Sequence, residues 1–281
     1  MTTQKILLCL AHPDDEILGP GGTIAQYAQN GTTVELVCAT RGEAGEIADP
    51  ALATPETLAE VREAELRCAA ETLGIDQVTF LGYRDSGMAG TVENQRPDAF
   101  INADADEVVA QLVTIMRRVQ PQVVITFEPY GGYGHPDHIA IHHHTHAAFD
   151  KAGDAEYRLD LGRPFQPQRL FYPLVRTAFF RDMKAKMEQH GLDTSFFADL
   201  EANRQNGWPD DKYNLVVNVS STVNRKMAAF ACHRTQFGAD NFFRRLPESE
   251  MAQLLQTEYF ALAYPPSANG LQLSSLFDGL P

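Results

Sequence analysis

Short apolar segments alternate with segments of helical spacing through the first 150 residues of this 281-residue chain. We expect four buried strands, at residues 5–10, 33–39, 77–82 and 122–127. We expect helices at residues 21–30, 55–73, 103–119 and 137–151. Because strands joined through helices pair in parallel with right-handed crossovers, this order predicts an α/β fold, a Rossmann-like, mostly parallel sheet flanked by helices.

The second half of the chain is less regular. Residues 168–175 and 213–219 are typical of added strands, and residues 178–190 and 221–236 of helices. Neither a repeat nor an obvious linker interrupts the sequence. We therefore expect one domain over residues 1–281, in which a Rossmann-like core (1–150) carries the site and a C-terminal α/β elaboration (151–281) shapes it.

The helix over residues 55–73 has explicit boundary signals. Thr54 is a candidate N-cap, Pro55 suits the first helical position, and Gly74 follows the last turn. Thr57 stands where a capping box requires Glu or Gln, so that reciprocal motif is absent.

Charge and composition narrow the classes of partner. The chain carries 37 acidic and 23 basic side chains, a formal net charge of −14. Such a surface repels phosphate backbones and anionic membranes, so we expect neither nucleic acid nor a membrane as a partner. The N-terminus has neither a long apolar stretch nor a cleavage site, which favours a cytoplasmic protein. A homo-oligomer is compatible with the sequence.

Cofactor fingerprints are missing. No GxGxxG follows the first strand, so a nucleotide cofactor is not indicated. No CxxC occurs, so neither a thiolate metal site nor a redox motif is supported. Cys9 and Cys38 lie in apolar strands as small hydrophobic residues, and the fold has no need of a disulfide, although the sequence does not exclude one.

Polar side chains follow each of the four predicted strands. The segments are AHPDDE (11–16), TRGEAGE (40–46), YRDSG (83–87) and EPYGGYGHPDH (128–138). In open α/β sheets the carboxyl ends of parallel strands meet at one edge, where ligands bind. We therefore expect the four segments to form a single site.

Two of these segments share the pattern His-Pro-Asp, at residues 12–14 and 135–137. The proline restricts its own backbone and that of the preceding histidine, which fixes the directions of the side chains. Histidine and carboxylate ligands without thiolate suit Zn²⁺ or Fe²⁺, and three protein ligands plus a water form a catalytic site. The alternative is a solvated turn in which one aspartate caps a helix, and it leaves the second aspartate unexplained.

Other histidines compete for the ligand roles. His138 and His142 are four residues apart and would share a helix face, as in zincin-type sites, but no Glu occupies the zincin position. We expect a polar helix face, a helix end or the surface for His142, His143, His144, His146, His190 and His233.

The motifs together resemble those of a known family. AHPDDE near the N-terminus, followed by GHPDH at residues 134–138, resembles the PIG-L/LmbE-like family of metal-dependent N-deacetylases. The strings GEAGEI, YRDSGMAGT and GGYGHPDH look most like the mycothiol-pathway branch, whose deacetylase acts on N-acetylglucosaminyl-inositol and whose sister amidase cleaves mycothiol S-conjugates. The resemblance covers residues 5–150, and the HRTQ segment at 233–236 fits more loosely.

The resemblance implies the metal site and the base. It gives one Zn²⁺ per chain, with Fe²⁺ as the alternative, bound by His12, Asp15 and His138. Asp14 would be the general base that takes a proton from the attacking water.

The same resemblance implies how the oxyanion is stabilised. His135 and the Tyr133 hydroxyl would contact it, and Asp137 would orient the His135 imidazole and favour its charged form. Asp14 or His135 would return the proton to the leaving amine, and the sequence leaves both open.

The resemblance implies that the sugar is recognised by Glu46, Arg62 and Asp85. For Arg62 a surface ion pair with Glu65 is an equal alternative. The amidase branch tends to carry a lysine after its first motif, and residues 17–22 contain none, which favours simple deacetylation.

The expected function is deacetylation of a small molecule that contains N-acetylglucosamine. Within the same chemistry, alternatives are the amidase reaction and deacetylation of N-acetylglucosaminyl-malate or a chito-oligosaccharide. A catalytically silent carbohydrate-binding protein would lack part of the motif, which is complete here. A phosphoesterase would require more carboxylates and more basic residues.

Overall fold

One sheet of seven strands organises the part of the chain that the computed structural model describes, residues 3–202, 207–238, 241–266 and 270–280. The strands are β1 (Lys5–Leu10), β2 (Thr33–Thr40), β3 (Gln77–Tyr83), β4 (Val123–Ile125), β5 (Arg169–Leu174), β6 (Leu215–Asn218) and β7 (Thr257–Tyr264). The helices are α1 (Asp15–Leu18), α2 (Gly21–Gln29), α3 (Leu58–Leu73), α4 (Ala105–Val119), α5 (Gly131–Gly134), α6 (Pro136–Ala152), α7 (Thr177–Gln189), α8 (Ser195–Ala202), α9 (Val223–Cys232) and α10 (Glu248–Leu255).

The strand order is β3-β2-β1-β4-β5-β7-β6. The first five of these pair in parallel, whereas β7 pairs antiparallel with both β5 and β6. The predicted mostly parallel α/β fold is therefore confirmed. The chain moves outward from β1 to β2 and β3 on one side, and to β4 and β5 on the other. Such a reversal opens a crevice at the carboxyl ends of β1 and β4.

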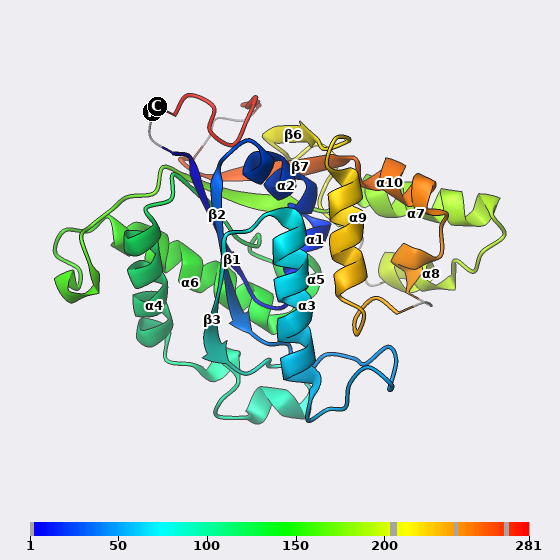
Figure 1. The fold of residues 1–281 in the computed structure, drawn as a ribbon, viewed down its shortest axis with the longest axis horizontal. Helices are drawn as coiled ribbons and strands as arrows, with labels where there is room; N and C mark the ends of the chain where they lie inside the picture. The colour runs from blue at the N-terminus through cyan, green and yellow to red at the C-terminus, as the bar shows by residue number, and fades with distance from the viewer. Residues whose placement is uncertain (1–2, 203–206, 239–240, 267–269, 281) are drawn as a thin grey trace.

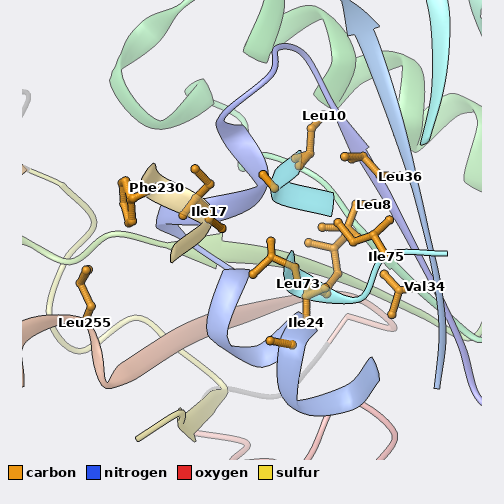
Figure 2. Packing of buried hydrophobic residues seen from close by; sticks show 14 of the residues in the cluster. Leu8, Leu10, Ile17, Ile24, Val34, Leu36, Leu73, Ile75, Phe230 and Leu255 are labelled. Carbon is orange, nitrogen blue, oxygen red and sulfur yellow. The ribbon is translucent and has the colours of Figure 1, made fainter. Parts of the chain in front are cut away.

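Both faces of the sheet are buried, which explains why β1 is apolar from Ile6 to Leu10. Alternate residues of β1 point to opposite faces, so Leu8 and Leu10 enter one core cluster while Leu7 and Cys9 enter the other. Figure 2 shows the first cluster, in which side chains of β1 and β2 meet those of α2, α3 and α9. Helices α4 and α6 cover the opposite face (Figure 1).

Most predicted helices are confirmed within two residues, but two boundaries are wrong. Helix α3 begins at Leu58 with Thr57 as N-cap, because the Thr54 hydroxyl donates to Glu56 and the preceding residues form a separate turn. Helix α9 ends at Cys232, so the HRTQ segment leaves the helix.

Three elements of the second half were not predicted: α8, α10 and β7. The strand β7 alternates buried and partly exposed residues, as expected for a strand packed on one side. It lies between β5 and the edge strand β6 and pairs antiparallel with both, an arrangement that was not predicted.

The structure also shows how the cysteines are paired and whether any helix could span a membrane. Cys68 and Cys232 form a disulfide that joins α3 to α9, while Cys9 and Cys38 are free and buried. Within the described ranges, no helix combines the length and apolar character needed to cross a bilayer.

Helix α6 packs histidines where a polar face was expected. Only His143 is exposed, whereas His142 is buried and His144 and His146 are half-buried. Burial lowers the pKa of all three packed histidines, and for His146 burial together with the charge of His142 lowers it to about 4.

This packing predicts acid-sensitive stability. Between pH 6.5 and 4 the unfolded chain binds a proton at His146 that the folded chain does not, so the free energy of unfolding falls as the pH falls through that window. The free energy of unfolding of the metal-free protein is measured by urea titration at pH 7 and at pH 5. His146→Gln should reduce the difference between these two free energies by at most about 2 kcal/mol, since the side chain is partly screened by solvent. His143→Gln on the exposed face is the control, and equal effects of the two variants would contradict the assignment.

Candidate metal-binding and catalytic site

The loops after β1, β3 and β4 bring histidines and aspartates together at the predicted crevice. Among the described residues, two groups have potential ligand atoms that all lie within 4.8 Å of one another. One group is His12, His135 and His138, and the other is His12, Asp85, His135 and Asp137. All of these residues are buried, and they come from three of the four segments that were expected to meet at this edge.

Two imidazole lone pairs face each other in the crevice. His138 Nδ1 lies 3.0 Å from the Gly131 carbonyl oxygen, so Nδ1 carries the donated proton and Nε2 carries a lone pair. His12 Nε2 lies 3.1 Å from Asp137 Oδ2, which assigns the proton to Nε2 and the lone pair to Nδ1. The facing atoms, His12 Nδ1 and His138 Nε2, are only 3.1 Å apart. In the metal-free protein, where the pKa of His12 is raised, a second proton on His12 Nδ1 can lie between the two nitrogens. A metal cation at this point would replace that proton and accept both lone pairs.

Asp15 adds a third electron-pair donor at the same point. Its Oδ1 lies 3.3 Å from His138 Nε2, and its Oδ2 lies 3.8 Å from His12 Nδ1. The backbone N–H of His12 donates to Oδ2 at 2.8 Å and fixes the carboxylate. Tetrahedral zinc with bonds of about 2.0–2.1 Å needs donor atoms about 3.3 Å apart. The three side chains therefore fit a divalent cation, although Asp15 belongs to neither of the two 4.8 Å groups.

Electrostatics agrees with that geometry. Burial would raise the pKa of Asp15, but His138 and His12 outweigh burial and lower it, so the carboxylate is ionised. Burial would lower the pKa of His12, but Asp85, Asp137 and Asp15 raise it well above its ordinary value. The site thus attracts positive charge to the position that the three donors surround.

Asp85 and Asp137 lie behind His12. Asp85 Oδ1 is 3.5 Å from His12 Nε2 and accepts the backbone N–H of Gly87 at 2.8 Å. Asp137 Oδ2 accepts the backbone N–H of Ser86 at 2.9 Å besides contacting His12. Both carboxylates therefore hold the side of the His12 ring that faces away from His138.

This arrangement differs from the expectation for Asp137 and His135. The carboxylate of Asp137 orients His12, and only its backbone N–H reaches His135, donating to Nδ1 at 3.1 Å. Burial, followed by the charges of His12 and His138, lowers the pKa of His135 to about 4. His135 is therefore neutral near pH 7, with the proton on Nε2, whereas the sequence analysis expected its charged form to be favoured.

Asp14 projects from a backbone conformation that side chains rarely adopt, with φ at 111°. The guanidinium of Arg62 donates to Asp14 Oδ2 at 3.0 Å, to the Pro13 carbonyl at 2.6 Å and to the Gly42 carbonyl at 2.9 Å. Burial raises the pKa of Asp14 to about 6, and Arg62 offsets part of that shift.

Arg62 is buried, so the alternative of a surface ion pair with Glu65 is wrong. Glu65 instead accepts the backbone N–H and the hydroxyl of Thr235, at 2.8 and 2.6 Å. The glycines of GEAGE explain how Arg62 is accommodated. Gly42 has a positive φ of 71°, and a Cβ at Gly42 or Gly45 would overlap the guanidinium.

Tyr133 and Glu46 lie nearer the solvent. Tyr133 is 47% exposed, and its ring stands edge-on to His138 with centroids 5.1 Å apart. Its short helix α5 is held by Glu128, which accepts the backbone N–H groups of Tyr130 and Gly132 at 2.6 Å each. Glu46 is exposed, which leaves its carboxylate accessible to a ligand.

Two buried residues of the site were not predicted to interact. His233 Nε2 lies 2.7 Å from Glu16 Oε1, and both side chains are 0% exposed. A surface position was one expectation for His233, and that expectation is wrong, because the residue caps α9 inside the protein. The signal in the sequence was Glu16 itself, an acid beside two aspartates that already had roles.

Comparison with known proteins gives consistent family matches. Residues 7–149 match the family model PIG-L, described as GlcNAc-PI de-N-acetylase. The chain is 38% identical over 291 residues to a 1D-myo-inositol 2-acetamido-2-deoxy-alpha-D-glucopyranoside deacetylase of Geodermatophilus obscurus, covering 99% of each protein. It is 39% identical over 277 residues to the protein of that name from Acidothermus cellulolyticus, covering 93% of this chain and 91% of the relative.

Solved structures share the fold at lower identity. N,N'-diacetylchitobiose deacetylase from Pyrococcus horikoshii has a TM-score of 0.65 at 22% identity, covering 93% of this chain and 84% of that one. The 4-carboxy-2-hydroxymuconate hydratase GalB of Pseudomonas putida has a TM-score of 0.62 at 21% identity, covering 96% of this chain and all of that one. Since a hydratase shares the fold, the architecture alone does not select deacetylation.

The three proposed ligands, His12, Asp15 and His138, predict which substitutions release a metal ion. Asp15→Asn and His138→Ala should each abolish stoichiometric zinc binding in titration calorimetry, because each removes one of three donors. Asp85→Asn, a buried carboxylate of the same cluster, should keep stoichiometric zinc with affinity reduced by about 10–100-fold. Zinc loss in Asp85→Asn with retention in Asp15→Asn would instead place the ion in the group behind His12.

Proposed function

The chain belongs to the PIG-L family, and from this we propose that it is a metal-dependent N-deacetylase of a small molecule that contains N-acetylglucosamine. N-acetylglucosaminyl-inositol is the proposed substrate, because the full-length relatives are named for its deacetylation. The observation that carries the proposal is that His12 Nδ1 and His138 Nε2 face each other with the Asp15 carboxylate beside them. Asp14 is the residue directly before Asp15 in the sequence.

One zinc ion per chain is the proposed cofactor, with Fe²⁺ as the alternative that the same ligands would accept. When bound, such an ion lowers the pKa of a water molecule and polarises an amide carbonyl. His12, Asp15 and His138 would hold it, and the carboxylates of Asp85 and Asp137 keep the His12 ring in the required tautomer.

Asp14 is the proposed general base. Its side chain is 21% exposed against 8% for Asp15, so it is the more accessible of the two adjacent carboxylates. Arg62 holds Oδ2, which leaves Oδ1 to accept the proton from water. A pKa of about 6 lets Asp14 be ionised near pH 7 and still release the proton afterwards.

His135 and Tyr133 are the proposed donors to the oxyanion that water attack creates. His135 accepts a backbone N–H at Nδ1, so its Nε2–H is available as a donor. Partial burial of Tyr133 at the crevice and the negative charges of Asp15 and Asp14 raise its pKa, so its hydroxyl remains protonated and can donate. Because His135 is neutral near pH 7, we assign the proton for the leaving amine to Asp14.

Glu46 is the proposed contact to sugar hydroxyls, because it is exposed and follows Gly45, which lies against the Arg62 guanidinium. Arg62 and Asp85 are buried and already bonded within the chain, so we propose that they support recognition through Asp14 and His12. The net charge of −14 disfavours phosphate backbones and anionic membranes as partners, which supports an enzyme that acts on a free small molecule, and we propose the cytoplasm as its location.

A substrate panel tests the function. Purified zinc-loaded protein is incubated with N-acetylglucosaminyl-inositol, N-acetylglucosaminyl-malate, chito-oligosaccharides and a mycothiol S-conjugate, and released acetate and free amine are measured. The proposal expects acetate from the inositol conjugate at the highest kcat/KM. Cleavage of the thiol conjugate without acetate release would identify the amidase instead, and no product from any member would contradict the proposal.

Asp14→Ala should separate metal binding from catalysis. Because Asp14 is not one of the three donors, the variant should retain stoichiometric zinc while kcat falls by about 10²–10⁴-fold. His190→Ala on the surface is the control and should keep wild-type kcat. A variant that retains full turnover would remove Asp14 as the base.

A further inference from the structure

The positive φ of Asp14 is not explained by the residues next to it in the sequence. Its φ of 111° and ψ of −19° place a residue with a side chain in a conformation that favours glycine. Such strain persists only where surrounding contacts determine it. One contact is Arg62, which holds the Asp14 carboxylate and the carbonyl of Pro13.

The second contact comes from Glu16. Its Oε2 accepts the backbone N–H of Asp14 at 3.0 Å, so the carboxylate fixes the peptide that turns the Asp14 side chain toward the crevice. Its Oε1 lies 2.7 Å from His233 Nε2. The two oxygens thus have separate partners, and His233 determines where the Glu16 carboxylate lies.

His233 is itself anchored to helix α3. The preceding residue, Cys232, forms the disulfide with Cys68 of α3. Two residues after His233, Thr235 is bound by Glu65 of the same helix. The segment that carries His233 is therefore held to α3 on both sides.

We propose that Glu16 and His233 are positioning residues for catalysis, which hold the Asp14 backbone in its left-handed conformation so that the carboxylate faces the attacking water. The inference rests on the proposed function of Asp14 as the base. Both side chains are fully buried, so their effect on catalysis would pass through the Asp14 peptide.

A second buried ion pair shows what a purely structural pair looks like in this protein. Glu258 pairs with Lys226 at 2.6 Å, and its oxygens accept the backbone N–H groups of Gly22 and Thr23 at the start of α2. That pair caps a helix, whereas Glu16 binds the one peptide that orients the proposed base.

The first test compares His233→Leu with His233→Gln. The leucine removes the donor to Glu16, and kcat for the inositol conjugate should fall at least 10-fold with KM and zinc stoichiometry unchanged. The glutamine amide can donate to Glu16 and should restore part of kcat. His190→Leu removes a histidine–glutamate contact of the same 2.7 Å length at the surface and should leave kcat unchanged. Wild-type kcat in His233→Leu, or loss of its zinc, would overturn the proposal.

A double-mutant cycle separates positioning from general destabilisation. If His233 acts through Asp14, His233→Leu should change the residual kcat of Asp14→Ala by less than 2-fold, because no base is left to position. Equal loss in both backgrounds would show a structural role independent of Asp14 and would overturn the proposal.

A crystal structure of zinc-loaded His233→Leu tests the geometry without any activity. We expect the Asp14 φ to leave the left-handed region, and an unchanged backbone would overturn the inference. If His233→Leu does not fold, Glu16→Leu takes its place with the same two outcomes, because leucine neither accepts the Asp14 N–H nor binds His233. If the wild-type protein deacetylates nothing in the panel, the proposed function fails, and this structure still decides whether Glu16 and His233 position Asp14.

Discussion

The contact between His12 Nδ1 and His138 Nε2 is the constraint on which the site depends. When both rings are neutral, each histidine gives its proton to an acceptor on its far side, so two lone pairs point at each other across 3.1 Å. Two electron-pair donors do not remain at this distance unless positive charge lies between them, and the Asp15 carboxylate approaches the same point. The outer acceptors, the Gly131 carbonyl and Asp137, orient the two rings so that the facing nitrogens could hold the cation that we propose.

Helix α3 gives that site its rigidity. Three residues spaced three apart along this helix each bind another part of the chain. Arg62 binds the carbonyl of the Pro13–Asp14 peptide, and Glu65 binds Thr235. Cys68 forms the disulfide with Cys232. The first motif of the chain and the C-terminal part are therefore both fixed to one helix. Helix α3 packs closely on α9 beside the sheet (Figure 1), which gives all three anchors a common frame.

Features that depend on neighbouring residues could be predicted from the sequence, whereas contacts between residues far apart in the chain could not. Strand β1 was predictable because both of its faces are buried, and the site's edge followed from the strand ends. The choice of His12, Asp15 and His138 as ligands came from the resemblance of the motifs at those ends to the PIG-L/LmbE-like family. The partner of Glu16 could not be predicted, because His233 lies 217 residues away and no pattern joins the two. The orientation of Asp137 was also missed, since sequence neighbourhood to His135 does not show which ring a carboxylate reaches.

Anomalous diffraction at the zinc edge from zinc-loaded crystals tests the central claim most directly. The account predicts one strong peak per chain at about 2.0–2.1 Å from His12 Nδ1, His138 Nε2 and an oxygen of Asp15. A peak on the other side of the His12 ring, between its Nε2, Asp85 and His135, would contradict the tautomers and the ligand set together. So would crystals that hold no ordered zinc in the crevice.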